Sequence, residues 1–162
     1  MRLAEEVRYL MLAVQREGNR YFTEALRPLS LTASQAEVLR ILQDYQPISL
    51  GELGGLLVCE TGSPSRLVNG LVNAGLVERV PSPLDGRAVT LTLTELGQER
   101  ARQVVVIEAA MDEQIMRILG DAPVEDVLAM FWRYIEGRPA GNALARRTGR
   151  HGQTRKGRHD AL

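Results

Sequence analysis

The sequence contains a single cysteine, Cys59, among its 162 residues. One thiol can form neither a disulfide within the chain nor a zinc site built from several thiolates, and this cysteine usage fits reducing surroundings. Long apolar runs are also missing: residues 104–107 form a run far shorter than the roughly 20 residues of a membrane-spanning helix. The N-terminus reaches Glu5 and Glu6 at once and lacks the apolar core of a secretory signal. We therefore expect a cytoplasmic protein without a membrane partner.

Recognisable catalytic residue sets are absent as well. The sequence has no glycine-rich phosphate loop, no nucleophile with a histidine companion in its periodic part, and no paired metal ligands. His151 and His159 lack carboxylate or thiol companions at a ligand spacing. We expect no enzyme activity, no metal and no cofactor. Cys59, beside Val58, is expected to be a small buried residue rather than a redox sensor.

Charge is distributed unevenly, although the formal net charge is zero. Residues 1–136 contain 13 Arg and 19 acidic residues, whereas residues 137–162 contain six Arg and Lys156 against Asp160 alone. The basic tail, residues 138–162, has no periodic apolar positions and is expected to be disordered. Two interpretations stay open for it: a solvated terminus, or an arm that contacts nucleic-acid phosphates without sequence preference.

Helical periodicity dominates the remainder. Apolar residues at steps of three and four predict a first helix from Leu3 to Pro28. Two capping boxes, in which a serine or threonine is followed three residues later by Gln or Glu, predict further helix starts. They are Thr32 with Gln35 and Ser49 with Glu52. The second of these helices is short, and its Gly54 and Gly55 are expected to let a neighbouring helix pack closely.

A fourth helix is predicted between Ser63, as N-cap, and Gly75, as a left-handed stop. Residues 76–80 and 88–94 alternate in polarity and predict an antiparallel hairpin with a long loop. Residues 95–119 and a segment ending near Gly137 are again helical. The fold class is therefore mainly α with a small β-hairpin, an α+β chain in which a winged helix-turn-helix joins long dimerisation helices. The expected regions are 1–30 and 95–137 for dimerisation, 31–94 for DNA binding, and the 138–162 tail.

The helix after Ser63 carries a polar face opposite its apolar stripe. The residues on that face are Ser65, Arg66, Asn69, Gly70 and Asn73. The candidate DNA contacts on this helix are Ser65, Arg66, Asn69 and Asn73, together with Ser63 just before it. Asparagine can pair with adenine, arginine with guanine, and serine with a phosphate or a base edge, which suits a major groove. An ordinary solvated helix face would have a similar composition.

Three runs of sequence are distinctive enough to indicate a protein family. They are residues 71–79 (LVNAGLVER), 85–89 (DGRAV) and 93–97 (LTELG). Together they resemble the MarR family of bacterial winged helix-turn-helix regulators, and the resemblance extends over roughly residues 3–136. It implies that Arg87 on the wing enters a minor groove and that Asp85 holds it there. Many members have a second basic residue where this chain has Gly86.

The resemblance also implies a small aromatic or anionic effector between the helical dimer part and the winged lobes. Candidate contacts are Arg16, Arg20, Tyr21 and Tyr45. The function it implies is that of a homodimeric, effector-responsive repressor that binds a pseudo-palindromic operator in double-stranded DNA. Residues 51–94 contain three Arg against four acidic residues. This sparse positive charge keeps an alternative open, a winged-helix module that binds protein without sequence-specific DNA binding.

Overall fold

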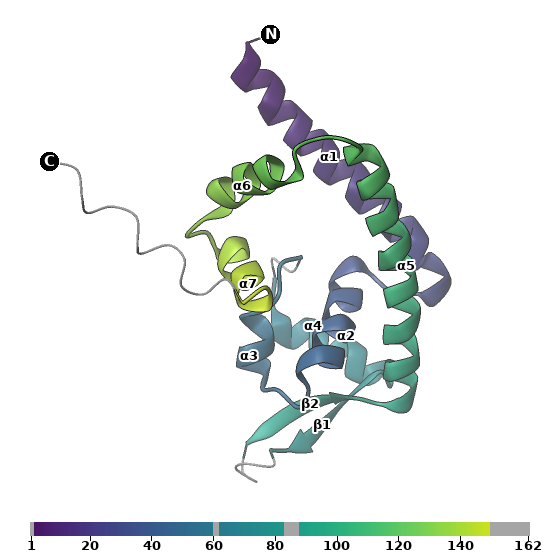
Figure 1. Cartoon of the computed structure of the whole chain (residues 1–162). Coiled ribbons are helices and arrows are strands. Elements are labelled where there is room, and N and C mark those ends of the chain that lie inside the picture. Colours follow the sequence, from purple (N-terminus) through teal and green to yellow (C-terminus); the bar gives the residue numbers. More distant parts are fainter. Residues whose placement is uncertain (1, 60–61, 83–87, 150–162) are drawn as a thin grey trace, which may run out of the picture.

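The computed structural model describes residues 2–59, 62–82 and 88–149, which form a mainly helical chain with one antiparallel hairpin, as the sequence predicted. The elements are α1 (Leu3–Leu26), a 3-10 turn (Arg27–Leu29), α2 (Ala33–Tyr45), α3 (Leu50–Gly54), α4 (Pro64–Asn73), β1 (Val77–Pro81), β2 (Val89–Leu93), α5 (Glu95–Leu119), α6 (Val124–Ile135) and α7 (Pro139–Arg147). In Figure 1 the hairpin lies at one end of the molecule, and α5 leads from it toward α6.

Side-chain caps start three of the helices. Both predicted capping boxes are formed. The backbone nitrogen of Gln35 donates to Thr32 Oγ1 at 3.2 Å, and the backbone nitrogen of Glu52 donates to Ser49 Oγ. The backbone and hydroxyl of Ser49 also donate to the Glu52 carboxylate and lower its pKa. Thr94 caps α5. Ser63 does occupy the N-cap position of α4, but its side chain makes no capping hydrogen bond; Pro64 at the first helical position, with its fixed φ, starts that helix.

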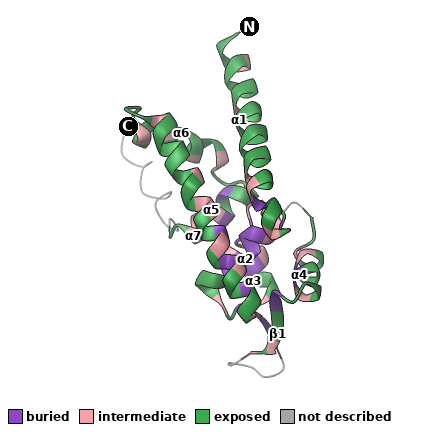
Figure 2. Ribbon diagram, turned by 90° about the vertical axis from the view of Figure 1, so that its right-hand side faces the viewer, coloured by how far each residue is buried: buried purple, intermediate pink, exposed green. Residues whose placement is uncertain are grey.

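The hydrophobic core is centred on α2. Ala36, Val38, Leu39 and Leu42 have no exposed surface, and α1, α3, α4, α5 and the hairpin pack around them. Figure 2 shows this buried centre, with most of α1 exposed above it. An ion pair between Arg40 Nε and Glu108 Oε2, 2.8 Å apart, also joins α2 to α5. The described part of residues 32–94, from the N-cap of α2 to the N-cap of α5, therefore forms one packed unit, which we call the lobe.

The hairpin pairs Val77 with Leu93 and Pro81 with Val89. It is also attached to the loop after α2. Ile48 forms an isolated antiparallel bridge with Leu91, and the Leu93 amide nitrogen donates to Gln46 Oε1 at 2.7 Å. These bonds fix the base of the hairpin to the lobe. Residues 83–87, which connect the two strands in the sequence, lie outside the described residues.

The C-terminal segment departs from the expectation of a disordered tail over 138–162. Pro139 starts a helix, α7, that continues to Arg147 and buries Gly141 and Ala143. Gly141 lies so close to the Ile135 carbonyl oxygen that a methyl group there would collide with it. The expectation was wrong for this stretch because Pro139 starts a helix there and small residues, rather than large periodic apolar residues, are buried on its contact face. Residues 150–162 lie outside the described residues.

Candidate nucleic-acid interface

Helix α4 has one buried face and one exposed face. Val68 and Leu71 are fully buried, which anchors the helix in the core. The residues predicted for the reading face, Ser65, Arg66, Asn69 and Asn73, are all exposed, and so is Ser63 just before the helix. The predicted separation of faces is confirmed, and it leaves a row of polar side chains open to a partner.

Helix α4 contacts α3 at its start and ends at a glycine. At the start, a methyl group on Gly54 would lie 3.4 Å from the Pro64 ring, an ordinary contact distance, so the packing of α3 on α4 does not require a glycine there. At the end, Gly75 has a φ of +70°, and the Leu76 amide nitrogen donates to the Leu71 carbonyl oxygen at 3.0 Å. This pattern is a Schellman motif, in which a left-handed residue lets the chain turn back over the last turn of the helix. The turn leads directly into the hairpin.

Arg79 is a candidate functional residue that the sequence reasoning missed. It lies on β1, it is exposed, and its guanidinium Nη2 donates to Asn69 Oδ1 on the outer face of α4. With that oxygen engaged, Asn69 presents its amide nitrogen, a donor, to a partner, and Arg79 adds positive charge beside it. The signal available in the sequence was the tight Gly75 turn, which places β1 next to α4.

The segment between α3 and α4 is held by a buried carboxylate. Glu37 on α2 is only 6% exposed, and its two carboxylate oxygens accept from the backbone amides of Val58 at 2.9 Å and Cys59 at 2.8 Å. Arg147 of α7 donates to Glu37 Oε1 at 2.9 Å. A carboxylate can remain charged at a buried position when it is paired and hydrogen-bonded in this way.

The expectation that Cys59 is buried was wrong: it is exposed, because it lies in the segment after α3 rather than in the core. Desolvation of the thiol, with the neighbouring Glu37 carboxylate, nevertheless raises the pKa of Cys59 to about 11. Since the thiolate is the reactive form, the thiol is protonated and unreactive at neutral pH.

We expect the rate of Cys59 alkylation by iodoacetamide to rise about tenfold per pH unit through pH 9.5, without reaching a plateau. The folded structure disfavours the thiolate, so its fraction keeps increasing well above the ordinary thiol pKa of about 8.5. The urea-unfolded chain is the control and should approach its plateau near pH 9. A folded protein that levels off at the same pH as the unfolded chain would contradict the raised pKa.

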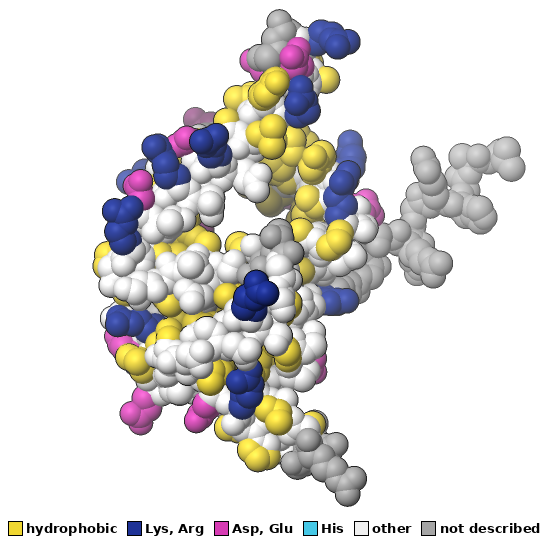
Figure 3. Space-filling model, turned by 180° about the vertical axis from the view of Figure 1, so that it is seen from behind, with side chains coloured by type: hydrophobic (Ala, Val, Ile, Leu, Met, Phe, Trp, Pro, Cys, Tyr) yellow, Lys and Arg dark blue, Asp and Glu magenta, His cyan; other side chains and the backbone are white. Residues whose placement is uncertain are grey.

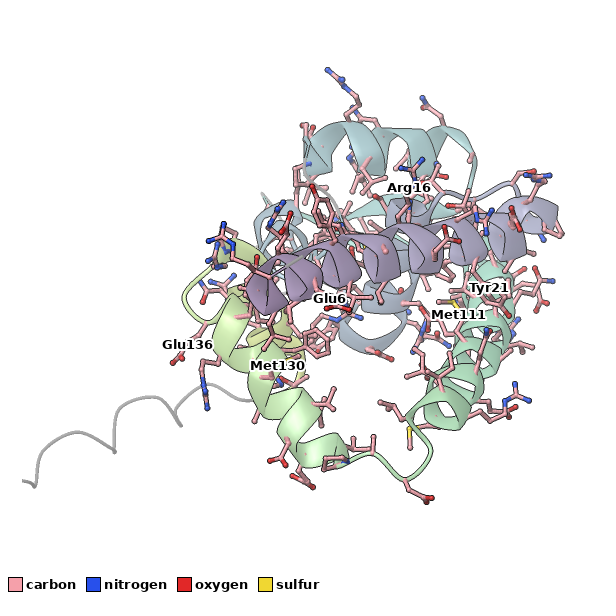
Figure 4. The ribbon with its side chains drawn as sticks, turned by 90° about the horizontal axis from the view of Figure 1, so that it is seen from above. Glu6, Arg16, Tyr21, Met111, Met130 and Glu136 are labelled. Atoms are coloured by element: carbon pink, nitrogen blue, oxygen red, sulfur yellow. The ribbon has the colours of Figure 1, made fainter. Side chains whose placement is uncertain are left out.

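The remaining predicted site residues are in three places. Asp85 and Arg87 lie outside the described residues. Arg16, Arg20 and Tyr21 lie on α1, which contacts α5, and Arg20 pairs with Glu17 at 2.6 Å. Figure 4 labels Arg16 and Tyr21 on α1 and Met111 on α5. Tyr45 instead ends α2, and its hydroxyl donates to the Arg147 carbonyl oxygen at 3.4 Å. Their role in effector binding stays a prediction.

Metal ligands and membrane spans are both missing from the described part of the chain. Residues 2–59, 62–82 and 88–149 contain no group of histidine, cysteine and acidic side chains that could hold a metal ion. Within the same ranges, every helix is too short or too polar to cross a membrane.

A short capped helix, a turn, a helix with an exposed polar face and a two-stranded wing define a winged helix-turn-helix protein. The sequence model of the MarR family matches residues 31–89, the region of this lobe. The multiple antibiotic resistance protein MarR of Escherichia coli K12 is 35% identical over 99 residues, which cover 59% of this chain and 69% of that protein. This chain belongs to the MarR family of transcriptional regulators.

Other relatives agree with this assignment. The transcriptional regulator MgrA of Staphylococcus aureus is 31% identical over 94 residues, covering 57% of this chain and 64% of MgrA. Among solved structures, a mutant of E. coli MarR complexed with operator DNA superposes with a TM-score of 0.70 at 27% identity, over 83% of this chain and 99% of that one. The S. aureus MepR–DNA complex has a TM-score of 0.71 at 18% identity, over 78% of this chain and 92% of that one, and shows the shared fold.

Proposed function

We propose that this regulator binds specific double-stranded DNA by placing α4 in the major groove. The observation that carries the proposal is the exposed polar face of α4, with Ser65, Arg66, Asn69 and Asn73 opposite the buried Val68 and Leu71. The serine and the two asparagines are short enough to let the helix approach base edges, and the set includes donors and acceptors that can distinguish base pairs. Arg79 then lies beside the groove, where its guanidinium can contact phosphate.

The wing supplies the second contact in this proposal. Arg87 enters the adjacent minor groove and Asp85 orients it. A narrow minor groove concentrates negative potential, so one guanidinium held by a carboxylate contributes there without a basic surface around it. Gln46 and Ile48, which bond the base of the hairpin to the lobe, support a fixed distance between α4 and the wing.

A homodimer would provide the second reading helix. Helix α6 buries none of its residues in the single chain, and Leu3, Val14 and Ile118 are each more than two-thirds exposed on α1 and α5. Figure 3 shows hydrophobic side chains gathered around the first half of α1, beside an opening in the molecule. Because isolated globular chains rarely expose so much apolar surface, we propose that α1, α5 and α6 pair with those of a second copy.

A two-fold dimer of this kind fits a pseudo-palindromic operator whose half-sites lie about one helical turn, ~34 Å, apart. Occupying a promoter in this way represses it by excluding the transcription machinery. A small aromatic or anionic effector that binds near Arg16, Arg20, Tyr21 and Tyr45 would relieve repression by favouring a different spacing of the two lobes.

Replacing Arg66 or Arg87 with alanine is expected to weaken binding to the selected operator by about 1–3 kcal/mol, roughly 5- to 150-fold. The operator is first recovered by sequencing the DNA that the wild-type protein selects from a random pool, and affinities are then measured by gel shift. Arg102→Ala is the matched control, since Arg102 is an exposed arginine on α5 that pairs with Glu99.

If both Arg66→Ala and Arg87→Ala bind the operator with unchanged affinity, neither arginine makes the DNA contact assigned to it. A wild-type protein that selects no sequence at all would favour the protein-interaction alternative, for which the three Arg and four acidic residues of 51–94 are the motivation.

A further inference from the structure

Helix α7 connects the C-terminal end of the described chain to the DNA-binding lobe. Arg146 Nη1 donates to the Gly55 carbonyl oxygen at 3.0 Å, and Arg147 Nη1 lies 2.9 Å from Glu37 Oε1. The Tyr45 hydroxyl on α2 adds a third bond by donating to the Arg147 carbonyl oxygen. A methyl group on Gly55 would collide with the Arg146 guanidinium, so the absence of a side chain there makes room for it. In Figure 1, α7 accordingly lies beside α3.

Glu37 links α7 to the segment that precedes α4. Its carboxylate holds the Val58 and Cys59 amides, which belong to neither α3 nor α4, and Cys59 precedes Pro64 by only five residues. Ser34 Oγ adds a bond to the Cys59 carbonyl oxygen at 3.5 Å. The N-terminal end of α4 has no side-chain cap, and these bonds from α2 hold the chain that leads toward it as far as Cys59.

Arg147 is the charge partner of the Glu37 carboxylate, which holds the Val58 and Cys59 amides. Glu37 is 6% exposed and Arg147 is 31% exposed, so the pair is mostly removed from water. A buried carboxylate strongly favours a charge partner, and without one the cost of its burial favours a rearrangement toward water, which weakens its hold on the two amides.

We propose that Glu37 and Arg147 are positioning residues for α4, and that docking of α7 on the lobe sets how firmly the reading helix is held. The proposal rests on the proposed function in one respect, namely that α4 is the helix that binds DNA. Docked α7 keeps the Val58 and Cys59 amides bonded and the N-terminal end of α4 in place. Undocked α7 leaves Glu37 unpaired and loosens that end.

A direct phosphate contact is the main alternative role for Arg146 and Arg147. The two roles differ in their dependence on salt. Loss of one phosphate contact reduces the slope of log affinity against log salt by about 1, whereas loss of a positioning residue lowers affinity at every salt concentration and leaves the slope unchanged.

Hydrogen exchange in the full-length protein tests the positioning role without DNA. In Arg147→Ala we expect the Val58 and Cys59 amides to exchange at least tenfold faster than in wild type, while the amides of α2 and α5 keep their rates. Glu37→Gln should have the same effect, because a neutral amide offers one acceptor in place of two. Arg147→Lys should restore slow exchange in part, and Arg102→Ala, which breaks a surface ion pair on α5, should leave it unchanged.

Gel shifts of the same variants on the selected operator complete the test. We expect Arg147→Ala to reduce affinity about tenfold with an unchanged salt slope. Wild-type exchange rates at Val58 and Cys59 in both Arg147→Ala and Glu37→Gln would overturn the proposal, and so would a salt slope reduced by about 1. If the wild-type protein selects no DNA sequence, the proposed function fails, while the exchange rates still decide whether α7 holds the start of α4.

Discussion

The double replacement Leu10→Asp and Phe131→Asp is expected to convert the protein into a monomer that binds its operator at least 100-fold more weakly. Both residues are about half exposed in the single chain, on α1 and α6, and a buried carboxylate without a partner would oppose pairing of these faces. Loss of the second reading helix removes the gain from two linked contacts, which is typically 10²–10⁴-fold. Sedimentation equilibrium and gel shifts measure the two effects.

Val89→Asp is the matched control for the oligomeric state, because Val89 is an exposed valine on β2, away from the proposed dimer faces. It should sediment like wild type. A double variant that remains a dimer would show that α1 and α6 do not form the interface, and a monomer with wild-type operator affinity would remove the need for two reading helices.

Gly97→Ala is expected to destabilise the folded protein by about 1–3 kcal/mol, the cost of an overpacked site. Gly97 lies in the first turn of α5, so close to the backbone of Leu76 that a methyl group would collide with the Leu76 carbonyl oxygen. That oxygen also accepts from the Thr94 amide nitrogen at 3.2 Å, and the Thr94 hydroxyl donates to Gly75 at 2.7 Å. Any shift at Gly97 therefore disturbs the junction between α4 and α5. Urea unfolding measures the loss.

The same substitution at Gly70 should have the opposite sign. Gly70 is exposed inside α4, and the nearest atom to an added methyl group, Gln35 Nε2, is 3.9 Å away. Alanine there removes the entropic cost of a helical glycine and should stabilise the protein by about 0.5–1 kcal/mol. Equal shifts in the urea midpoint for the two variants would contradict the close packing at Gly97.

The order of elements and the outer face of α4 could be predicted because both depend on local signals. Capping boxes at Thr32 and Ser49 and the positive φ of Gly75 are decided within a few residues of sequence. The spacing of Val68 and Leu71 likewise determines which side of α4 is buried, whatever the rest of the chain does.

The contacts around α4 could not be predicted in the same way, because they join residues distant in sequence. Glu37 and Arg147 are 110 positions apart, and nothing near either residue indicates the other. Helix α7 was also missed because the charge of residues 137–162, taken as a whole, obscured Pro139, a helix-starting residue, and the small buried Ala143. Arg79 was missed because the Gly75 turn predicts that β1 follows α4 closely, but not which side chain of β1 contacts Asn69.

The bonds from Ile48 and Gln46 to β2 have a consequence for spacer length in operators. They tie the hairpin to the lobe that carries α4, so in the proposed complex each lobe would span a fixed length of duplex. A base pair inserted within one half-site would then separate the two contacts of a single lobe, and binding there should fail. In the proposed dimer, a base pair inserted between half-sites would change only the distance and rotation between lobes and would leave the two contacts of each lobe in register.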